Sequence, residues 1–482
     1  MKNRKEVSER IGAYLSSKRE EIFERLATLC RIPSVEGAPT EGKPFGDAVD
    51  RAMKSALSFF SEEGFIPFSD REGRFSLATL EGGERRIGLF GHCDVVPAGE
   101  GWTVSNPYEP HRRDGFFFAR GCEDNKGGIV ASLYAMKAIK ELSLPFSSTL
   151  VSFIGANEES GMKDIEAFGE LFPMPDVSLV PDNDFPLSLG EKGRAEGWLV
   201  SPALSSAVLD FCGGECFNIV LDRVTVTLAY AEALYRELCE KKDPSVEYAV
   251  ERDGEHILLT VRGIAAHAST PRGSVNAAER AAYLLSTCET LNKQDRDIMA
   301  IASRLLSDPF GATLGIAGTD GAFGARTAAC GMVRIKDGCL TLSEDIRYGS
   351  ATSWDTLSKT IDVTLIPYGW RFACGEATDG FELEENSPLS SALLHVYREE
   401  SGDGEAMPYR SGGGTYARHL TNAYSVGLAC PVNGEKRTYP LPTGHGGVHQ
   451  ADECICEDEY LLAIRILTMM LLSLDEALSN EA

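Results

Sequence analysis

The stretch Ile87-Gly88-Leu89-Phe90-Gly91-His92-Cys93-Asp94 is a short apolar run that ends in a histidine and an aspartate. Its length and apolar character are typical of a buried strand. Residues 126–142 place apolar side chains at helical spacing, and further apolar runs of strand length occupy 150–155 and 177–180. This alternation of strand and helix predicts an α/β sheet with helices on its faces.

The rest of the chain extends this pattern and then interrupts it. We expect an amphipathic helix over 5–30, a strand over 74–80 and a closing helix over 458–474. Between them, short strand-like runs mix with helical ones, which predicts a second, α+β domain inserted into the first. The expected strands there are 198–201, 257–262 and 339–347, and the expected helices are 227–241 and 277–291. The predicted boundaries are 1–192 and 379–482 for the first domain and 193–378 for the inserted one.

Length and composition limit the classes of function. A chain of 482 residues is too long for one compact core, so two domains are expected. The formal charge of -25 disfavours binding to nucleic acid or to an anionic membrane surface. No apolar stretch reaches the roughly 18 residues of a membrane span. The 13 cysteines are odd in number and contain no Cys-x-x-Cys pair, which favours reduced thiols in a cytoplasmic enzyme.

Polar side chains stand just after three of the predicted strands. His92, Glu158 and Asp182 each follow one, and open α/β sheets place their sites at the carboxyl ends of strands. Asp124 precedes the helix at 126–142, and His449 lies far downstream. A site rich in carboxylate with some imidazole suits a pair of divalent cations such as zinc or manganese.

Several of these residues have an ordinary structural alternative. Asp124 or Asn125 could simply cap the following helix. Glu158 and Glu159 could form a solvated acidic turn, although the apolar run before them favours burial, where a cation or a proton-transfer role would use both. The competing ligands are Asp184 for Asp182 and His445 for His449.

The motifs around these residues resemble the M20 metallopeptidases, and within them the bacterial PepV-type dipeptidases. The run from Gly91 to Trp102, continuing through Asn106-Pro107-Tyr108, is similar to the first family motif. The run from Arg120 to Gly127 is similar to the second, and the order of Glu158-Glu159, Asp182 and His449 completes the match. The resemblance implies a zinc-peptidase-like mixed sheet flanked by helices, with an inserted α+β lid domain.

The resemblance also assigns a role to each residue of the site. His92 and Asp182 would hold one metal ion, Glu159 and His449 the other, and Asp124 would bridge them, with a cis peptide bond between Asp124 and Asn125. Asp94 would orient His92. Glu158 would be the general base for the water that the two ions share.

The inserted domain would supply contacts to the substrate. In the resemblance His267 stabilises the oxyanion of the scissile carbonyl and Asn218 contacts substrate, although the segment around Asn218 departs from the family pattern. Arg347 would bind the terminal carboxylate together with the glycine loop at Gly413, Gly414 and Thr415. The purely structural alternatives are a loop histidine for His267, a surface ion pair for Arg347 and a flexible loop for the glycines.

These observations together predict a metal-dependent dipeptidase that hydrolyses small peptides. The expected cofactor is two divalent ions, zinc first, with manganese or cobalt as alternatives. The rival functions are an N-acyl amino acid deacylase or desuccinylase of the same family, an aminopeptidase for longer peptides, and a non-catalytic metal- or peptide-binding protein. We expect a monomer, with a homodimer as the alternative.

Overall fold

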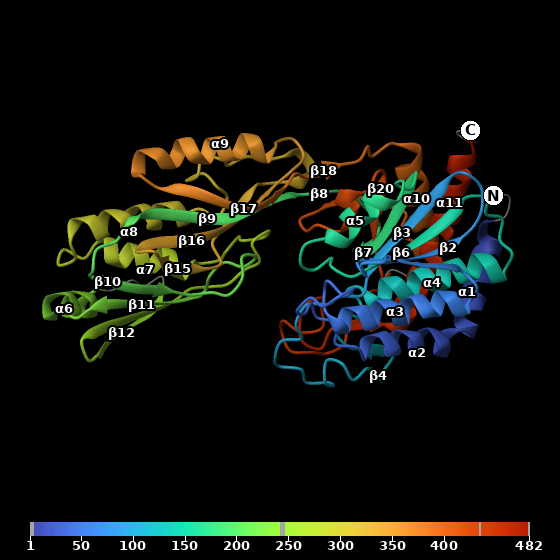
Figure 1. Cartoon of the computed structure of the whole chain (residues 1–482), viewed down its shortest axis with the longest axis horizontal. Helices are drawn as coiled ribbons and strands as arrows, with labels where there is room; N and C mark the ends of the chain where they lie inside the picture. Colours follow the sequence, from blue (N-terminus) through green and yellow to red (C-terminus); the bar gives the residue numbers. More distant parts are fainter. Residues whose placement is uncertain (1–3, 242–245, 433–434, 481–482) are drawn as a thin grey trace. The chain divides into compact units, whose positions relative to one another are not determined.

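The computed structural model describes residues 4–241, 246–432 and 435–480 (Figure 1). The chain divides into two compact units. Unit 1 comprises Met1–Gly190, Leu383–Tyr409 and Gly414–Ala482, and unit 2 comprises Glu191–Glu382 and Arg410–Gly413. Residues 191–192, 379–382 and 410–413, which were expected in the first domain, cluster with unit 2.

Unit 1 is an α/β structure around one mixed sheet. The strands run in the order β1-β2-β6-β3-β7-β20-β8. The four central strands β6, β3, β7 and β20 run parallel to one another. Their bounds are β1 (Ile66–Ser69), β2 (Ser76–Leu80), β3 (Arg86–His92), β6 (Thr149–Gly155), β7 (Val177–Asn183), β8 (Ser188–Glu191) and β20 (Ala423–Gly427). The helices are α1 (Arg4–Ser17), α2 (Arg19–Cys30), α3 (Asp47–Glu62), α4 (Lys126–Glu141), α5 (Lys163–Leu171), α10 (Pro388–Ser401), α11 (Glu457–Asn480) and the 3-10 helix η3 (Tyr416–His419).

Successive apolar side chains of β3 point to opposite faces of this sheet and pack on both. Ile87 and Leu89 join the large core that includes α4 and α11, while Phe90 points the other way and stacks on Phe153 with ring centroids 5.2 Å apart. Phe168 of α5 meets Phe90 edge-on at 5.5 Å. Because successive strand residues face opposite sides, a strand that is apolar throughout is covered on both faces.

Local sequence explains where individual helices begin and end. The Ser387 side chain accepts a hydrogen bond from the backbone N–H of Ser390, Pro388 occupies the first turn, and α10 ends at Gly402 with φ 78°. This combination of an N-terminal cap, an early proline and a C-terminal glycine favours a helix of these bounds.

Unit 2 contains two antiparallel sheets and four α-helices among its described residues. One sheet has the order β10-β11-β13-β12, and the other has the order β14-β16-β9-β17 with β15 paired to β16. The first sheet consists of β10 (Val208–Cys212), β11 (Arg223–Ala229), β12 (Glu247–Asp253) and β13 (His256–Arg262). The second consists of β9 (Gly193–Ala203), β14 (Thr327–Ala329), β15 (Val333–Lys336), β16 (Cys339–Tyr348) and β17 (Arg371–Thr378). The helices are α6 (Glu232–Glu240), α7 (Ala277–Ser286), α8 (Lys293–Leu306) and α9 (Trp354–Leu365), with 3-10 turns η1 (Gly321–Phe323) and η2 (Ile366–Tyr368).

A few short strands complete the chain. In unit 1 a small sheet has the order β21-β5-β4. Its strand β21 follows His449 by a few residues in sequence. The strands of this sheet are β4 (His111–Arg113), β5 (Phe116–Phe118) and β21 (Cys454–Cys456), and β18 (Phe381–Glu382) and β19 (Tyr409–Ser411) lie where the chain passes from one unit to the other.

Two of the predicted elements were wrong in detail. The single helix expected over 5–30 is two helices that part at Lys18, so that α1 packs on α11 while α2 packs on α4. The helix expected over 227–241 begins only at Glu232, because residues 227–229 belong to β11. There the alternating side chains of β11 pair with β13, and this tertiary pairing overrides the helical reading of the segment.

Candidate metal centre

Three neighbouring strands bring the first ligand candidates together. His92 is the last residue of β3, Asp182 lies in β7, and Glu158 and Glu159 follow the end of β6. Because β6, β3 and β7 are adjacent and parallel, their carboxyl ends meet at one edge of the sheet. The Nε2 atom of His92 lies 3.5 Å from an Asp182 oxygen and 3.9 Å from a Glu158 oxygen.

Asp124 joins this group from the turn before α4. Its Oδ1 atom lies 3.1 Å from His92 Nε2, and its Oδ2 atom lies 3.0 Å from His449 Nε2. The Asp124–Asn125 peptide bond is cis, as the resemblance implies. Asn125 occupies the N-cap position of α4, but its side chain makes no capping hydrogen bond. One carboxylate thus offers a separate oxygen to each imidazole.

The two competing ligand candidates lie elsewhere. His445 directs its Nδ1 atom to Asp452, at 2.7 Å, whereas His449 lies 3.2 Å from a Glu159 oxygen. Asp184 is exposed, and its backbone N–H donates to the Tyr409 hydroxyl. The fold therefore gathers His449 and Asp182 rather than their neighbours.

The donor set fits divalent cations. Two groups have donor atoms close enough together to share an ion, His92 with Glu158 and Asp182, and His92 with Asp124 and Glu159. One oxygen each of Glu158 and Glu159, and the Nε2 atom of His92, are buried without a hydrogen-bond partner. Buried polar atoms without such partners are costly unless a cation satisfies them. Carboxylate and imidazole together suit zinc or manganese.

The pKa values show how strongly the carboxylates interact. Burial and the neighbouring carboxylates raise the pKa of Glu158 well above its usual value, and burial together with Asp124 raises the pKa of Glu159 to about 7. Burial opposes the ionisation of Asp124 too, but its close contacts with the imidazoles of His449 and His92 outweigh burial and lower the pKa of Asp124. Those contacts with Asp124 and Glu159 raise the pKa of His449 to about 11. So much negative charge in one buried place calls for compensating positive charge.

Further residues hold this cluster in place. Asp94 lies beside His92, with its backbone oxygen 3.1 Å and its side-chain oxygen 3.3 Å from Nδ1, and it also accepts from the backbone N–H of Glu159. The buried amide of Asn125 donates to Asp182 at 2.8 Å and to the backbone oxygen of Pro181 at 2.5 Å. For the side chain of Asn125 the sequence suggested only a helix cap, and this contact was missed.

Asp164 and Tyr416 support the loop that carries the two glutamates. Asp164 accepts from the backbone N–H groups of Ala156, at 2.6 Å, and Asn157, at 3.0 Å, and also from the hydroxyl of Tyr416. The Tyr416 ring in turn meets the His92 ring edge-on at 6.2 Å. Nothing in the sequence indicated this role, because Asp164 is an isolated aspartate outside the recognised motifs.

The substrate-contact candidates in unit 2 have identifiable partners. His267 is exposed, its Nδ1 atom lies 2.7 Å from the Ser269 hydroxyl, and the adjacent backbone N–H of Ala268 donates to the backbone oxygen of Asn218. His267 and Asn218 therefore lie on neighbouring backbone segments. Arg347 is buried and donates from Nε and Nη2 to the two oxygens of Asp345.

The glycine loop uses several of its polar groups internally. Arg347 Nη1 donates to the backbone oxygen of Gly412, and the Gly413 N–H donates to Ser411 Oγ at 3.1 Å. Thr415 caps η3 by accepting from the N–H of Ala417. A side chain at Gly414 would collide with the guanidinium of Arg418. A substitution at Gly414 would therefore require the flexible Arg418 side chain to move.

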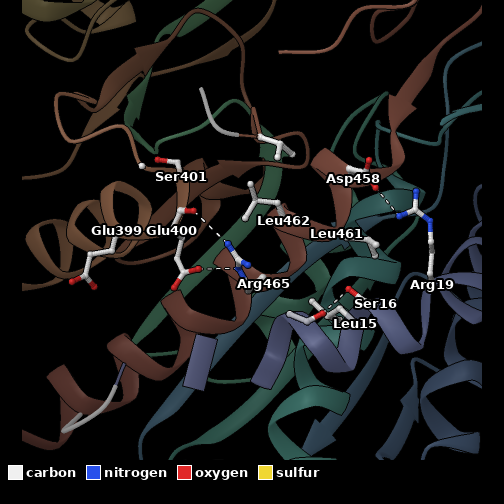
Figure 2. Close-up of a pocket in the computed structure, with 13 residues that line it drawn as sticks. Leu15, Ser16, Arg19, Glu399, Glu400, Ser401, Asp458, Leu461, Leu462 and Arg465 are labelled. Atoms are coloured by element: carbon white, nitrogen blue, oxygen red, sulfur yellow. Dashed lines mark hydrogen bonds and ion pairs between the residues drawn. The ribbon is translucent and has the colours of Figure 1, made fainter. Parts of the chain in front are cut away.

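A cavity of about 450 Å³ lies in another part of unit 1, between α1, α10 and α11. Figure 2 shows two charged pairs among its lining residues, Arg465 with Glu400 and Arg19 with Asp458, and the apolar side chains of Leu15, Leu461 and Leu462. None of the metal-centre residues lines it. Among the described residues, no helix is both long and apolar enough to cross a membrane.

The chain belongs to the peptidase family M20/M25/M40, whose model matches residues 88–473. It is a hydrolase of the peptidase class, and membership implies the use of divalent metal. It is 29% identical over 460 residues to "Putative dipeptidase YtjP" of Bacillus subtilis (strain 168), a match that covers 92% of this chain and 95% of that protein. "Putative dipeptidase SAR1836" of Staphylococcus aureus (strain MRSA252) is 27% identical over 432 residues, covering 85% of this chain and 89% of that protein.

Solved structures share the fold over nearly the whole chain. Human carnosine dipeptidase 1 matches with a TM-score of 0.58 and 16% identity, covering 98% of this chain and 99% of that one. The di-peptidase Dug1p from Saccharomyces cerevisiae matches with a TM-score of 0.59 and 14% identity, covering 97% and 98%. These likenesses establish an M20 peptidase fold.

Proposed function

We propose that this protein hydrolyses dipeptides at a two-metal centre in unit 1. The observation that carries the proposal is the Asp124 carboxylate, which offers one oxygen toward His92 and the other toward His449. A carboxylate that faces two ligand groups in this way is suited to bridge two cations. His92 and Asp182 would hold one ion, and Glu159 and His449 the other.

Bound divalent ions lower the pKa of water and polarise the scissile carbonyl. The protein then has to move one proton, and Glu158 is our candidate base, since its side chain reaches the cluster and its pKa is raised by burial and by neighbouring carboxylates. Glu158 would accept the proton of the attacking water and deliver it to the leaving amine. Because Glu158 also groups with His92 and Asp182, its role as base rather than ligand is part of the proposal.

Residues of unit 2 would bind the substrate. We assign the oxyanion contact to His267 and the neighbouring substrate contact to Asn218. Arg347, held by Asp345, would bind the terminal carboxylate, with the loop Gly413–Thr415 contributing beside it. Recognition of a free carboxylate near the scissile bond would limit hydrolysis to the C-terminal residue, and clamping both ends of the substrate would restrict it to short peptides, in keeping with the names of the relatives.

One experiment tests substrate and mechanism together. Metal-free protein is refilled with zinc, manganese or cobalt and assayed on dipeptides, tripeptides and N-acyl amino acids. We expect dipeptides to be hydrolysed fastest, and a preference for tripeptides or N-acyl amino acids would overturn the dipeptidase assignment. The Glu158→Ala variant should lose at least about 100-fold in kcat while retaining its metal affinity. Glu166→Ala, an exposed position on α5, serves as the control and should keep full activity.

A further inference from the structure

Glu453 is a fully buried carboxylate whose hydrogen-bond donors all come from one short segment. Its Oε2 atom accepts from Arg120 Nη1 at 2.6 Å and from the N–H of Gly121 at 3.1 Å. Its Oε1 atom accepts from the N–H of Glu123 at 3.0 Å and from that of Asp124 at 3.3 Å. Both oxygens are therefore engaged, and Glu453 holds the main chain of the residue that faces both histidines.

The neighbouring residue Asp452 anchors a second segment. It accepts from the N–H and hydroxyl of Thr103, both at 2.7 Å, from the N–H of Val104 at 2.9 Å, and contacts His445. Asp452 and Glu453 follow His449 by only a few residues. The stretch of chain that carries His449 is thus tied to the turn that carries Asp124.

Stability alone does not explain the Arg120–Glu453 pair. Both side chains are almost completely inaccessible, with 1% and 0% of their side-chain surface exposed. Desolvation of two buried charges offsets most of their attraction, so the ion pair by itself adds little to the free energy of unfolding. Three backbone N–H groups on the same carboxylate, by contrast, fix the position of a loop.

We propose that Glu453 is a positioning residue for the metal centre: by holding residues 120–124 against the His449 segment, it sets the geometry of Asp124 and hence the affinity for metal. The inference rests on the proposed metal centre. Partners of this kind that orient metal ligands commonly change affinity by roughly 10- to 100-fold when they are removed.

A matched control exists in the same unit. Asp70 is a buried carboxylate that accepts from Arg74 Nε at 2.7 Å, from Arg74 Nη2 at 3.1 Å and from the Arg74 backbone N–H at 3.2 Å. It lies after β1, whose place in the sheet order is three strands from β3. Asp70→Asn therefore breaks an arginine–carboxylate pair, with a more exposed arginine, without touching the ligand loops.

The test measures zinc and manganese affinity of metal-free protein by competition with a chromogenic chelator, alongside the Tm of the metal-free protein. Glu453→Gln replaces one carboxylate oxygen with an NH2 group, which then faces either the Arg120 and Gly121 donors or the N–H groups of Glu123 and Asp124, so we expect at least a 10-fold loss of affinity. Asp70→Asn should lower the Tm but leave affinity within about 2-fold of wild type. Equal affinities in Glu453→Gln and wild type would overturn the inference.

Two further outcomes keep the result interpretable. If Glu453→Gln does not fold, Glu453→Asp replaces it: the charge remains, but the shortened side chain cannot reach all four donors, and unchanged affinity there would also overturn the inference. If the wild-type protein takes up neither metal, the proposed function itself fails. If the wild-type protein binds metal normally and the Glu453 variant binds it equally well, only the inference about Glu453 fails.

Discussion

Asp124 presents one carboxylate oxygen to each of two histidines, with Oδ1 3.1 Å from His92 Nε2 and Oδ2 3.0 Å from His449 Nε2. The two imidazoles come from segments of unit 1 that are far apart in sequence, one at the end of β3 and the other just before β21. This relationship underlies the proposed two-metal centre.

Metal removal is the first test of that centre. Dialysis against a chelator should abolish peptidase activity and lower the Tm, because the clustered carboxylates lose the cations that offset their repulsion. At a free metal concentration of 100 times Kd, each bound ion stabilises the fold by about 2.7 kcal/mol. Calorimetry with and without added zinc measures this difference, and a Tm that does not respond to metal would contradict the assignment.

The two C-terminal histidines should behave differently. His449→Ala removes an imidazole that contacts Asp124 and Glu159, so we expect it to bind one equivalent of metal less tightly by at least 10-fold. His445→Ala removes only the contact to Asp452 and should keep two tight equivalents. Metal stoichiometry measured by elemental analysis after gel filtration distinguishes them, and the reverse pattern would make His445 the ligand.

Asn125→Asp should be strongly destabilising. The new carboxylate would face the backbone oxygen of Pro181 and the carboxylate of Asp182, in place of an amide that donates to both. Leaving buried acceptors opposed and unpaired costs about 2 kcal/mol or more in the free energy of unfolding. Urea denaturation measures the loss. Asn386→Asp, at an exposed asparagine, is the control and should change stability by less than about 0.5 kcal/mol.

Gly155→Ala should disturb the packing that holds the loop carrying Glu158 and Glu159. A Cβ at this position would lie 2.0 Å from the Tyr416 hydroxyl and 2.9 Å from an Asp164 oxygen. Overpacking of this kind costs about 1–3 kcal/mol and would displace the residues that hold Ala156 and Asn157. We expect reduced kcat together with a lower Tm. Gly404→Ala, where no atom lies within 4 Å of the new Cβ, should leave both unchanged.

Acid should weaken the contact between α2 and α4. Burial alone would raise the pKa of Glu21, but hydrogen bonds from Lys137, Lys18 and Tyr134 lower it to about 2. The folded pKa is below the unfolded value, so the stability that Glu21 contributes is present above about pH 4.5 and is lost as the pH falls toward 2. Unfolding curves of wild type and Glu21→Gln should therefore differ constantly from pH 7 to 5 and converge below that range. A difference that grows on acidification would show that this carboxylate is not the charged partner of Lys137.

Sequence reasoning located most of the chemistry because strand ends can be recognised locally. The apolar runs before His92, Glu158 and Asp182 predicted strands, and the structure has β3, β6 and β7 there. The helix over 227–241 failed because a local pattern does not show that residues 227–229 pair with β13. Asn125 and Glu453 were missed because their partners, Pro181 and the 120–124 turn, are set by the fold.

The sequence by itself determined the α/β character of unit 1, the membership in the M20 family and the candidate ligands, because side-chain periodicity and short motifs are written locally in the chain. Only the tertiary structure decided that His449 and Asp182, rather than His445 and Asp184, join the cluster. It also decided that Asp124 faces two histidines at once. Distances between residues far apart in sequence follow from how β3, β6 and β7 align and from hydrogen bonds such as those of Glu453, and no local pattern contains them.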